Sequence, residues 1–318
     1  MKKMFLRFCV VMCAIALSGF VFYSCSDDEK PGDEPGDGKV DPSTIAKDNL
    51  IAYWDFEDSS KDVIGQRGAA TSAVAYVNGQ RGKAYQGTEG AYISFDLTNS
   101  DALATVKAYT MATWIKAPKV TDKGIGMFFQ LTGTEFLGSL AFFQENVWVD
   151  GGNDNNFLGL KTFFSKKLQN EGDWVGHDWK VDDENFPADK WFHIVHNYDN
   201  ATSKASIYVN GKLLMVTKGA FDLETRYRTN PEPTQDDDGN VINENPNGVP
   251  KLGDLILPLR DSGNKGIIGF WANRAFDGAE DDWMGYYYGA LDELRIYNRA
   301  LTADEVQSLY DAELTQLN

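Results

Sequence analysis

Short runs in which apolar and polar residues alternate fill most of the chain beyond residue 49, and a period of two predicts β-strands. In LIAYWDFE, at 50–57, Ala52, Trp54 and Phe56 share one face. Clear runs also occupy 91–95, 109–116 and 126–131, and weaker ones occupy 140–143, 147–149 and 158–163. Because no convincing helical period occurs before Thr302, the pattern predicts an all-β fold.

The strongest hairpin signal lies in the second half of the chain. WFHIVHNY at 191–198 and KASIYV at 204–209 are joined by DNATS, and Asn210-Gly211 then leads into KLLMV. Asn-Gly is the preferred pair for a two-residue turn between antiparallel strands. These residues therefore predict three strands that pair in sequence.

One short helix is predicted at the C-terminal end. Thr302 and Glu305 have the spacing of a capping box, and Val306, Leu309 and Tyr310 follow on one helical face. Together with the strands, this predicts a two-sheet antiparallel jelly-roll sandwich with a short C-terminal helix.

Asp292 stands out in the last strand, ALDELRIY at 290–297. Strict alternation places Asp292 on the face of three apolar residues and places Glu293 on the opposite face. Burial of a carboxylate is costly unless the group is hydrogen-bonded or bound to a metal. The pattern leaves two hypotheses open, a structural anchor or one arm of a cation site.

Two long stretches lack a clear strand pattern and are expected to leave the sheets, at 161–190 and 221–265. Stretches of this length inside a domain are usually functional or disordered.

The N-terminal residues predict export. Lys2, Lys3 and Arg7 precede an apolar run at 8–17, so residues 1–24 are interpreted as a signal peptide. Residues 25–48 are rich in Pro, Gly and Asp and are expected to form a flexible linker before a domain at 49–318.

Ser24-Cys25 resembles a bacterial lipobox, although Phe22 and Tyr23 depart from its usual pattern. The acidic SDDE at 26–29 resembles the signal that sends lipoproteins of Bacteroides-type bacteria to the outer cell surface. This resemblance implies lipidation of Cys25 and anchoring to the outer membrane, with the domain facing the cell exterior.

Composition narrows the function classes. The formal net charge of −17, from 30 basic and 47 acidic residues, disfavours nucleic acid as a partner because phosphate backbones are repelled. All three cysteines lie within the first 25 residues, which removes disulfides and thiol nucleophiles from the domain.

The order of motifs resembles the laminin-G-like (LamG, concanavalin A-like lectin/glucanase) jelly rolls. The resemblance covers about residues 50–314 and rests on LIAYWDFED, GKAYQGTEGAYISF, YTMATWIKAP, KWFHIVHNYDNATSKASIYVNGKLL and YYYGALDELRIYNRALTADEVQSL. It implies two packed antiparallel sheets with adjacent first and last strands. Proteins of this architecture include lectins, hydrolases and structural modules, so the fold does not decide the function.

The resemblance also suggests a structural Ca²⁺ held by Glu57, Asp62 and Asp292, because the first and last strands would bring them together. The alternative is that Asp292 accepts hydrogen bonds from backbone amides and no metal binds.

Carbohydrate binding is the favoured function, since sugars need exposed aromatic platforms beside amide or carboxylate groups. The candidate residues near polar loops are Trp148, Trp174, His177, Trp179, Trp271 and Trp283. Trp174, His177 and Trp179 form the densest group.

No catalytic residue is assigned. The carboxylate pattern of the glucanases, Glu-x-Asp-x-x-Glu or a close variant, does not occur. The leading hypothesis is a non-catalytic carbohydrate-binding or adhesion module of an outer-membrane lipoprotein. The alternatives are a glycoside hydrolase with atypical carboxylates and a structural surface protein without a small ligand.

Overall fold

The computed structural model describes residues 40–119, 125–134, 136–145, 148–149, 152–153, 159–167, 172–180, 186–202, 204–214, 234–235, 241–243 and 253–315. Residues 39–318 form one compact unit, separate from residues 1–38. The predicted signal peptide, Cys25 and most of the predicted linker lie outside the described residues. No helix in the described part is long and apolar enough to cross a membrane.

The first sheet has the strand order β15-β14-β13-β6-β20-β4-β3, and β1 also pairs with β20. Its strands are β1 (Leu50–Trp54), β3 (Ala75–Asn78), β4 (Lys83–Gln86), β6 (Tyr109–Lys116), β13 (Trp191–Asp199), β14 (Lys204–Val209), β15 (Lys212–Leu213) and β20 (Ala290–Tyr297). Every pairing is antiparallel. The predicted hairpins of β13, β14 and β15 are confirmed, as is the adjacency of the first and last strands.

The second sheet has the order β12-β11-β8-β7-β18-β5-β2, and β19 pairs with β7 in parallel. Its strands are β2 (Ala70–Ser72), β5 (Tyr92–Asp96), β7 (Ile125–Leu131), β8 (Leu140–Gln144), β11 (Gly159–Lys167), β12 (Gly172–Lys180), β18 (Lys265–Ile268) and β19 (Met284–Gly285). Two separate strand pairs are β9 (Trp148–Val149) with β10 (Gly152–Asn153) and β16 (Thr234–Gln235) with β17 (Val241–Asn243).

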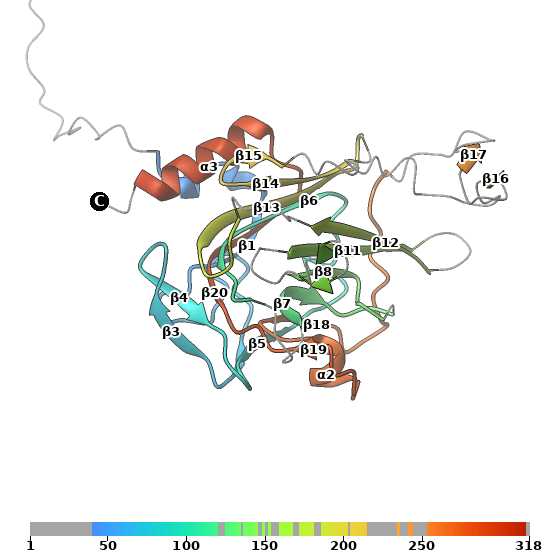
Figure 1. Cartoon of the computed structure of the whole chain (residues 1–318), viewed down its shortest axis with the longest axis horizontal. Helices are drawn as coiled ribbons and strands as arrows, with labels where there is room; N and C mark the ends of the chain where they lie inside the picture. Colours follow the sequence, from blue (N-terminus) through green and yellow to red (C-terminus); the bar gives the residue numbers. More distant parts are fainter. Residues whose placement is uncertain are drawn as a thin grey trace, which may run out of the picture. The chain divides into compact units, whose positions relative to one another are not determined.

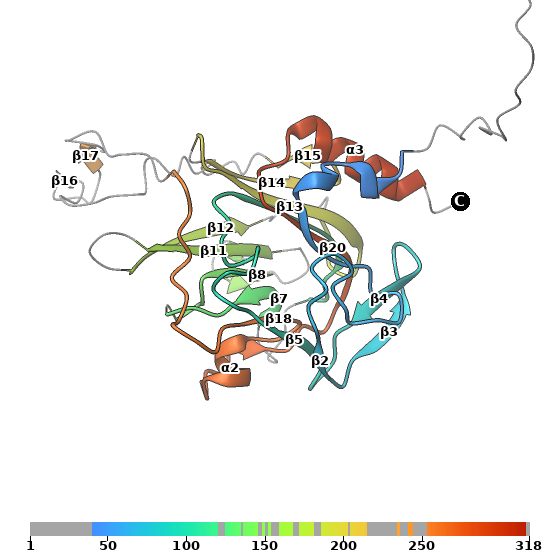
Figure 2. The ribbon, with the colours of Figure 1, turned by 180° about the vertical axis from the view of Figure 1, so that it is seen from behind.

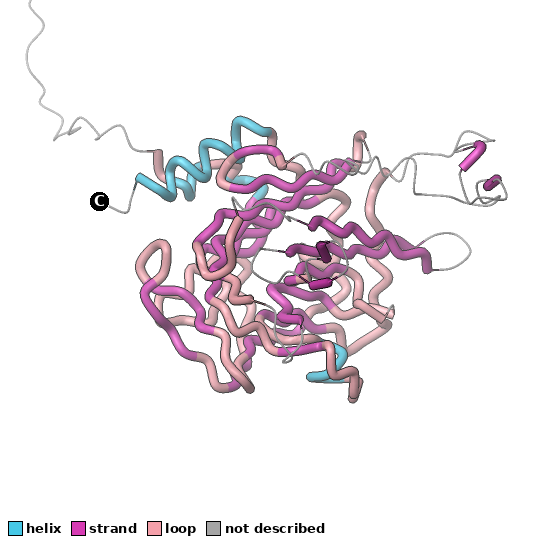
Figure 3. The backbone as a smooth tube through the Cα atoms, viewed as in Figure 1, coloured by secondary structure: helices cyan, strands magenta, loops and turns pink. Residues whose placement is uncertain are grey.

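Strands dominate the described chain (Figure 3), and the helices are few and short. They are α2 (Ala272–Phe276), α3 (Ala303–Thr315) and the 3₁₀ turns η1 (Pro42–Thr44) and η2 (Lys47–Asn49). Figures 1 and 2 show α3 against the first sheet and α2 beside the second.

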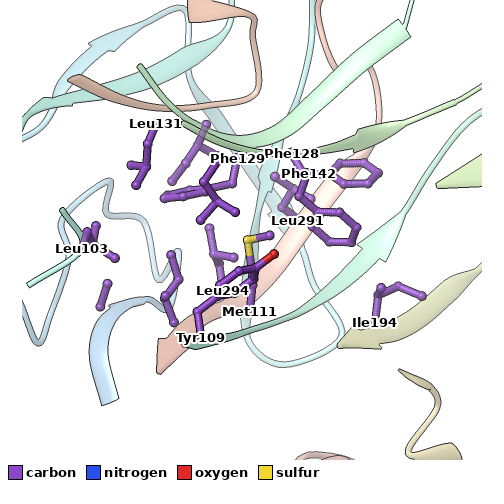
Figure 4. Packing of buried hydrophobic residues seen from close by; sticks show 14 of the residues in the cluster. Leu103, Tyr109, Met111, Phe128, Phe129, Leu131, Phe142, Ile194, Leu291 and Leu294 are labelled. Carbon is purple, nitrogen blue, oxygen red and sulfur yellow. The ribbon is translucent and has the colours of Figure 1, made fainter. Parts of the chain in front are cut away.

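The main core fills the space between the two sheets. Tyr109, Met111 and Leu294 of the first sheet meet Phe129 and Phe142 of the second, all fully or almost fully buried (Figure 4). Burial of apolar area at roughly 25 cal/mol per Å² is the main source of stability for such a sandwich. The expected all-β two-sheet sandwich with a C-terminal helix is confirmed.

Helix α3 covers the outer face of the first sheet. Val306 and Leu309 pack on Val195 and Tyr297. The predicted capping box is present: the Glu305 N–H donates to Thr302 Oγ1 (3.2 Å), and the Thr302 N–H donates to Glu305 Oε2 (2.8 Å).

Ordered structure begins before residue 49. Asp41 caps η1 by accepting a hydrogen bond from the Ser43 N–H, and Pro42 is buried. Ile45 packs on the same apolar cluster as α3, which explains why the end of the predicted linker is held in place.

The stretch 161–190 is not an excursion from the sheets, contrary to the expectation. Most of it belongs to a hairpin of β11 and β12 that extends the second sheet, with nine residue pairs in register. Leu160, Thr162 and Phe164 are buried at a period of two, in agreement with the weak strand predicted at 158–163. Within 221–265, the structure describes only β16, β17, the start of β18 and a non-strand segment at 253–264.

The last strand contains a β-bulge that strict alternation does not anticipate. Glu293 has φ of 54°, and the pairing of β20 with β6 shifts between Asp292 and Arg295. An extra residue in one strand changes the face on which the following side chains lie. Leu291 and Leu294 both face the core, so the prediction that Asp292 and Leu294 share a face was wrong.

Candidate functional site

An apolar cluster covers the outer face of the second sheet, away from the main core. We call it the outer aromatic cluster. Its buried members are Ile125, Met127, Ala141, Phe143, Ile267, Phe270, Trp271, Ala272 and Met284, and Tyr92, Leu137, Ala275, Phe276 and Tyr286 pack against them. The cluster joins β7, β8 and β18 to α2 and β19, so its side chains stand on rigid elements.

Two exposed aromatic rings lie at one end of this cluster. Phe136 is 56% exposed and Trp283 is 39% exposed, and their ring centroids are 6.5 Å apart. Trp283 packs edge-on against the buried Trp271 at 5.0 Å, and the Trp271 indole N–H donates to the Ile125 carbonyl at 2.6 Å. Phe136 and Trp283 are here called the aromatic pair, and Trp283 is held at the surface by the fixed Trp271 indole beneath it.

Buried amides fix the loop that carries Phe136. The Gln130 amide nitrogen donates to the Leu137 carbonyl and to Asn273 Oδ1, both at 3.0 Å, and its oxygen accepts from the Ala272 N–H at 2.7 Å. The Asn273 amide nitrogen donates to the Phe136 carbonyl. Because every partner is buried or partly buried, this network pre-organises the loop rather than leaving it to order upon binding.

Acidic groups lie directly N-terminal to Trp283 of the aromatic pair. Glu280, Asp281 and Asp282 immediately precede Trp283, and Glu280 and Asp282 are exposed. The neighbouring cations are engaged elsewhere: Arg260 forms a two-pronged ion pair with Asp277, and Arg274 donates to the Met284 carbonyl at 2.8 Å. The site thus offers flat apolar rings beside hydrogen-bond acceptors.

The structure separates the sequence-predicted carbohydrate residues. Trp283 lies in the aromatic pair, whereas Trp271 is fully buried, so its predicted role as an exposed platform does not fit its position. Trp148 lies on β9, and Trp174, His177 and Trp179 lie on the edge strand β12, but their side chains fall outside the described residues.

Phe136 was not among the predicted residues. It follows the polar TGTE in the loop after β7, so a search for loop aromatics that included Phe as well as Trp would have found it. The amide network of Gln130 and Asn273 had no local signal, because its two residues are 143 positions apart.

The three predicted calcium ligands have protein partners. Asp62 Oδ1 accepts from three backbone N–H groups at 2.9–3.0 Å, and Oδ2 pairs with Arg67. Glu57 accepts from the Lys83 N–H at 2.9 Å, and Asp292 Oδ2 accepts from the Arg81 N–H at 2.8 Å. Asp62 is already paired with the Arg67 cation, so it is poorly suited to serve as a calcium ligand.

Glu57 and Asp292 both bind the turn between β3 and β4, where the Lys83 N–H and the Arg81 N–H are their donors. Asp62 instead binds the backbone of Tyr53 and of its own loop. Among the described residues, no three Asp, Glu, His or Cys side chains are grouped so as to hold a metal ion. Calcium binding stays a prediction, while the alternative role of Asp292 as an acceptor of a backbone amide is observed.

Asp292 and Glu293 both face the side of the first sheet that α3 covers, contrary to the prediction that they lie on opposite faces. Arg81 bridges them, because its N–H donates to Asp292 and its guanidinium pairs with Glu293 Oε2 at 2.9 Å. Arg295 pairs with Glu293 and with Glu313 of α3, and lies over the Tyr53 ring at 4.2 Å. We call this set of groups the closure network.

The closure network is buried, and burial dominates its protonation. Burial raises the pKa of Asp292 to about 8, with smaller contributions from the charges of Glu293 and Glu313. Burial also raises the pKa of Glu313 to about 7, opposed by the Arg295 charge. Burial lowers the pKa of His193, whose Nε2 lies 3.6 Å from Glu313, to about 3. The network anchors the last strand and α3 to the rest of the sheet.

Comparisons with known proteins agree with the fold. Residues 86–232 match the family model of the concanavalin A-like lectin/glucanases superfamily, so the resemblance is confirmed for that part of the chain. Comparison with curated proteins gives no match.

Three solved structures illustrate the similarity. The binding domain of Paraclostridial Mosquitocidal Protein 1 is 17% identical with a TM-score of 0.51, and the match covers 83% of this chain and 52% of that one. Domain 4 of AbnA, a GH43 extracellular arabinanase from Geobacillus stearothermophilus in complex with arabinotriose, is 19% identical, with coverage of 82% and 98% and a TM-score of 0.46. The binding domain of Botulinum Neurotoxin DC in complex with SialylT is 12% identical, with coverage of 84% and 52% and a TM-score of 0.48.

The match spans about half the length of the first of these structures. Its TM-score and identity support a shared fold and nothing more specific.

Proposed function

Starting from the concanavalin A-like domain matched by residues 86–232, we propose that residues 49–318 form a non-catalytic glycan-binding module. The observation that carries the proposal is the aromatic pair. The two exposed rings lie side by side, and adjacent exposed apolar groups are more informative than single ones. Trp283 rests on a buried indole, and a buried amide network holds the loop of Phe136.

The chemistry of the aromatic pair suits sugars. Aromatic rings offer a large apolar face at little loss of side-chain entropy, and the carbon-bound hydrogens of a sugar ring form a matching apolar face. Carboxylates such as Glu280 and Asp282 accept hydrogen bonds from hydroxyl groups.

Glycan arrays with the chain from Ser26 onward test the proposal, followed by titration of the best ligand into Phe136→Ala and Trp283→Ala. We expect each substitution to weaken binding by about 2 kcal/mol, roughly 30-fold, as for other central aromatic contacts. Ile256→Ala is the matched control, because Ile256 is also 56% exposed but lies outside the cluster.

Failure of all arrayed glycans to bind would remove the proposal, as would full binding by both aromatic variants. Release of reducing ends from a bound polysaccharide would instead support the alternative of a glycoside hydrolase.

The proposed setting is the outer membrane, with a lipid on Cys25 and the domain facing the cell exterior. It is supported by the residues around Cys25 and the acidic SDDE that follows. Cys25→Ala should release the protein from the membrane fraction, and a variant that stays membrane-bound would exclude the lipid anchor. A structural Ca²⁺ at Glu57 and Asp292 is a separate proposal, supported by their binding to the same turn.

A further inference from the structure

A second set of partly exposed rings lies in the same outer aromatic cluster. Tyr286 stacks on the buried Phe270 with centroids 3.9 Å apart and an interplanar angle of 12°. Tyr92 lies over Phe270 at 6.1 Å and 30°. Tyr92 and Tyr286, here called the tyrosine pair, thus rest on one buried ring, as Trp283 of the aromatic pair rests on Trp271.

The two pairs are linked through short, rigid segments. Phe270 and Trp271, their buried supports, are adjacent in sequence. Trp283 and Tyr286 are separated only by β19, which is fixed by parallel pairing with β7. Three extended residues span at most about 10 Å, so Trp283 and Tyr286 lie within about 10 Å of one another along the backbone.

Arg274 occupies the region between the pairs. Its guanidinium lies 5.9 Å from the centre of the Phe270 ring, and its Nη1 donates to the carbonyl of Met284, the residue after Trp283. Burial raises the pKa of Tyr286, so its phenol remains protonated at neutral pH and available as a hydrogen-bond donor. Apolar faces and polar groups therefore continue from one pair to the other.

We propose that this face binds an internal stretch of a glycan chain, with separate sugars of the same chain on the aromatic pair and on the tyrosine pair. The inference rests on the proposed glycan-binding function and specifies its ligand class as a polysaccharide rather than a terminal sugar. Each pair alone is a weak site, and joining two weak sites through one ligand raises the affinity because the second contact becomes intramolecular.

Ladders of cello-, manno- and xylo-oligosaccharides, from disaccharide to hexasaccharide, test the inference by calorimetric titration of the chain from Ser26 onward. For the ladder that binds, we expect the affinity to rise at least about 10-fold with length and then to level off once both pairs are occupied. Free monosaccharide should not displace the hexasaccharide.

Tyr286→Ala should remove the gain with length while leaving disaccharide affinity unchanged, whereas Trp283→Ala should weaken binding at every length. Tyr92→Ala is the second variant, because it leaves the stack of Tyr286 on Phe270 intact and its effect cannot arise from loss of that packing. Matching melting midpoints confirm that each variant is folded.

Equal affinity for disaccharide and hexasaccharide would overturn the inference while leaving the proposed function in place. Unchanged hexasaccharide affinity in both tyrosine variants would do the same. Absence of binding to every ladder and to the glycan array would instead remove the proposed function and this inference with it.

Discussion

Replacing Asp292 with Asn should make the stability of the fold less sensitive to rising pH. Asp292 is fully buried, and its Oδ1 has no hydrogen-bond partner. The charged groups that act on it are Arg81 from the turn after β3, Glu293 from β20 and Glu313 from α3. Around these carboxylates lie Arg295, His193 and Tyr53. Asn keeps the acceptor for the Arg81 N–H but cannot ionise.

The sign follows from the raised pKa. The carboxyl has a pKa of about 8 in the fold, against a value of 3.8 for an unperturbed Asp. A group whose pKa is raised by folding favours the fold fully below its unfolded pKa, and that contribution is lost as pH rises through the folded pKa. At 1.36 kcal/mol per pH unit, the loss between pH 4 and pH 8 is on the order of 5 kcal/mol.

Urea denaturation of the wild type and Asp292→Asn at intervals from pH 4 to pH 9 measures this effect. The free energy of unfolding of the variant minus that of the wild type should increase as pH rises, and it should be constant above about pH 8. Two parallel pH profiles would refute the reasoning, because they would show that Asp292 is ionised in the fold throughout. Glu313→Gln supplies a comparison, since the raised pKa of Glu313 acts in the same direction.

Other predictions concern the acidic residues beside Trp283, the cap of α3 and the proposed calcium ion. Glu280→Gln with Asp282→Asn should raise the affinity for uronic-acid oligosaccharides several-fold at low salt, but not the affinity for neutral oligosaccharides. The control, Asp48→Asn with Asp58→Asn, should change neither affinity, and equal effects of the two double variants would refute a local role of Glu280 and Asp282. Thr302→Ala should lower the free energy of unfolding by about 1 kcal/mol in urea denaturation, because it removes the α3 cap. The calcium proposal expects EDTA to lower the melting midpoint, and an unchanged midpoint would remove it.

Most of the strands and the final helix could be predicted from the sequence. The alternation around Trp54, the Asn210-Gly211 turn and the Thr302–Glu305 capping box are local signals, and the structure confirms each of them. They suffice to predict two antiparallel sheets because each strand carries its own inward face.

The bulge at Glu293 was not predictable from the local pattern. A left-handed conformation is usually signalled by glycine, and here a glutamate adopts it because Arg81 and Arg295 hold its carboxylate. These partners are far away in sequence or lie beyond the bulge itself. The start of β11 was predicted by the weak run at 158–163, but its partner β12 was missed for a different reason, since GDWVGHDWK at 172–180 has no continuous apolar face.

The candidate site was recovered only in part. Trp283 and Trp271 have similar polar neighbours in the sequence. Only the fold shows that Trp283 is exposed and that Trp271 is buried beneath it. Phe136 and the tyrosine pair come from three distant segments, so no spacing rule joins them.

The pairing of β1 with β20 has a consequence for how the chain folds during synthesis. Leu50 is among the first residues of the domain to be made, and its partner Tyr297 is among the last. The first sheet cannot close until β20 has left the ribosome, because β20 lies between β6 and β4 and also pairs with β1. Until then the inner faces of both sheets remain open to solvent, and a contact of such high sequence separation forms slowly. We therefore expect the nascent chain to stay unfolded until translation is nearly complete. The proposed export of this chain would benefit, because export channels accept unfolded chains.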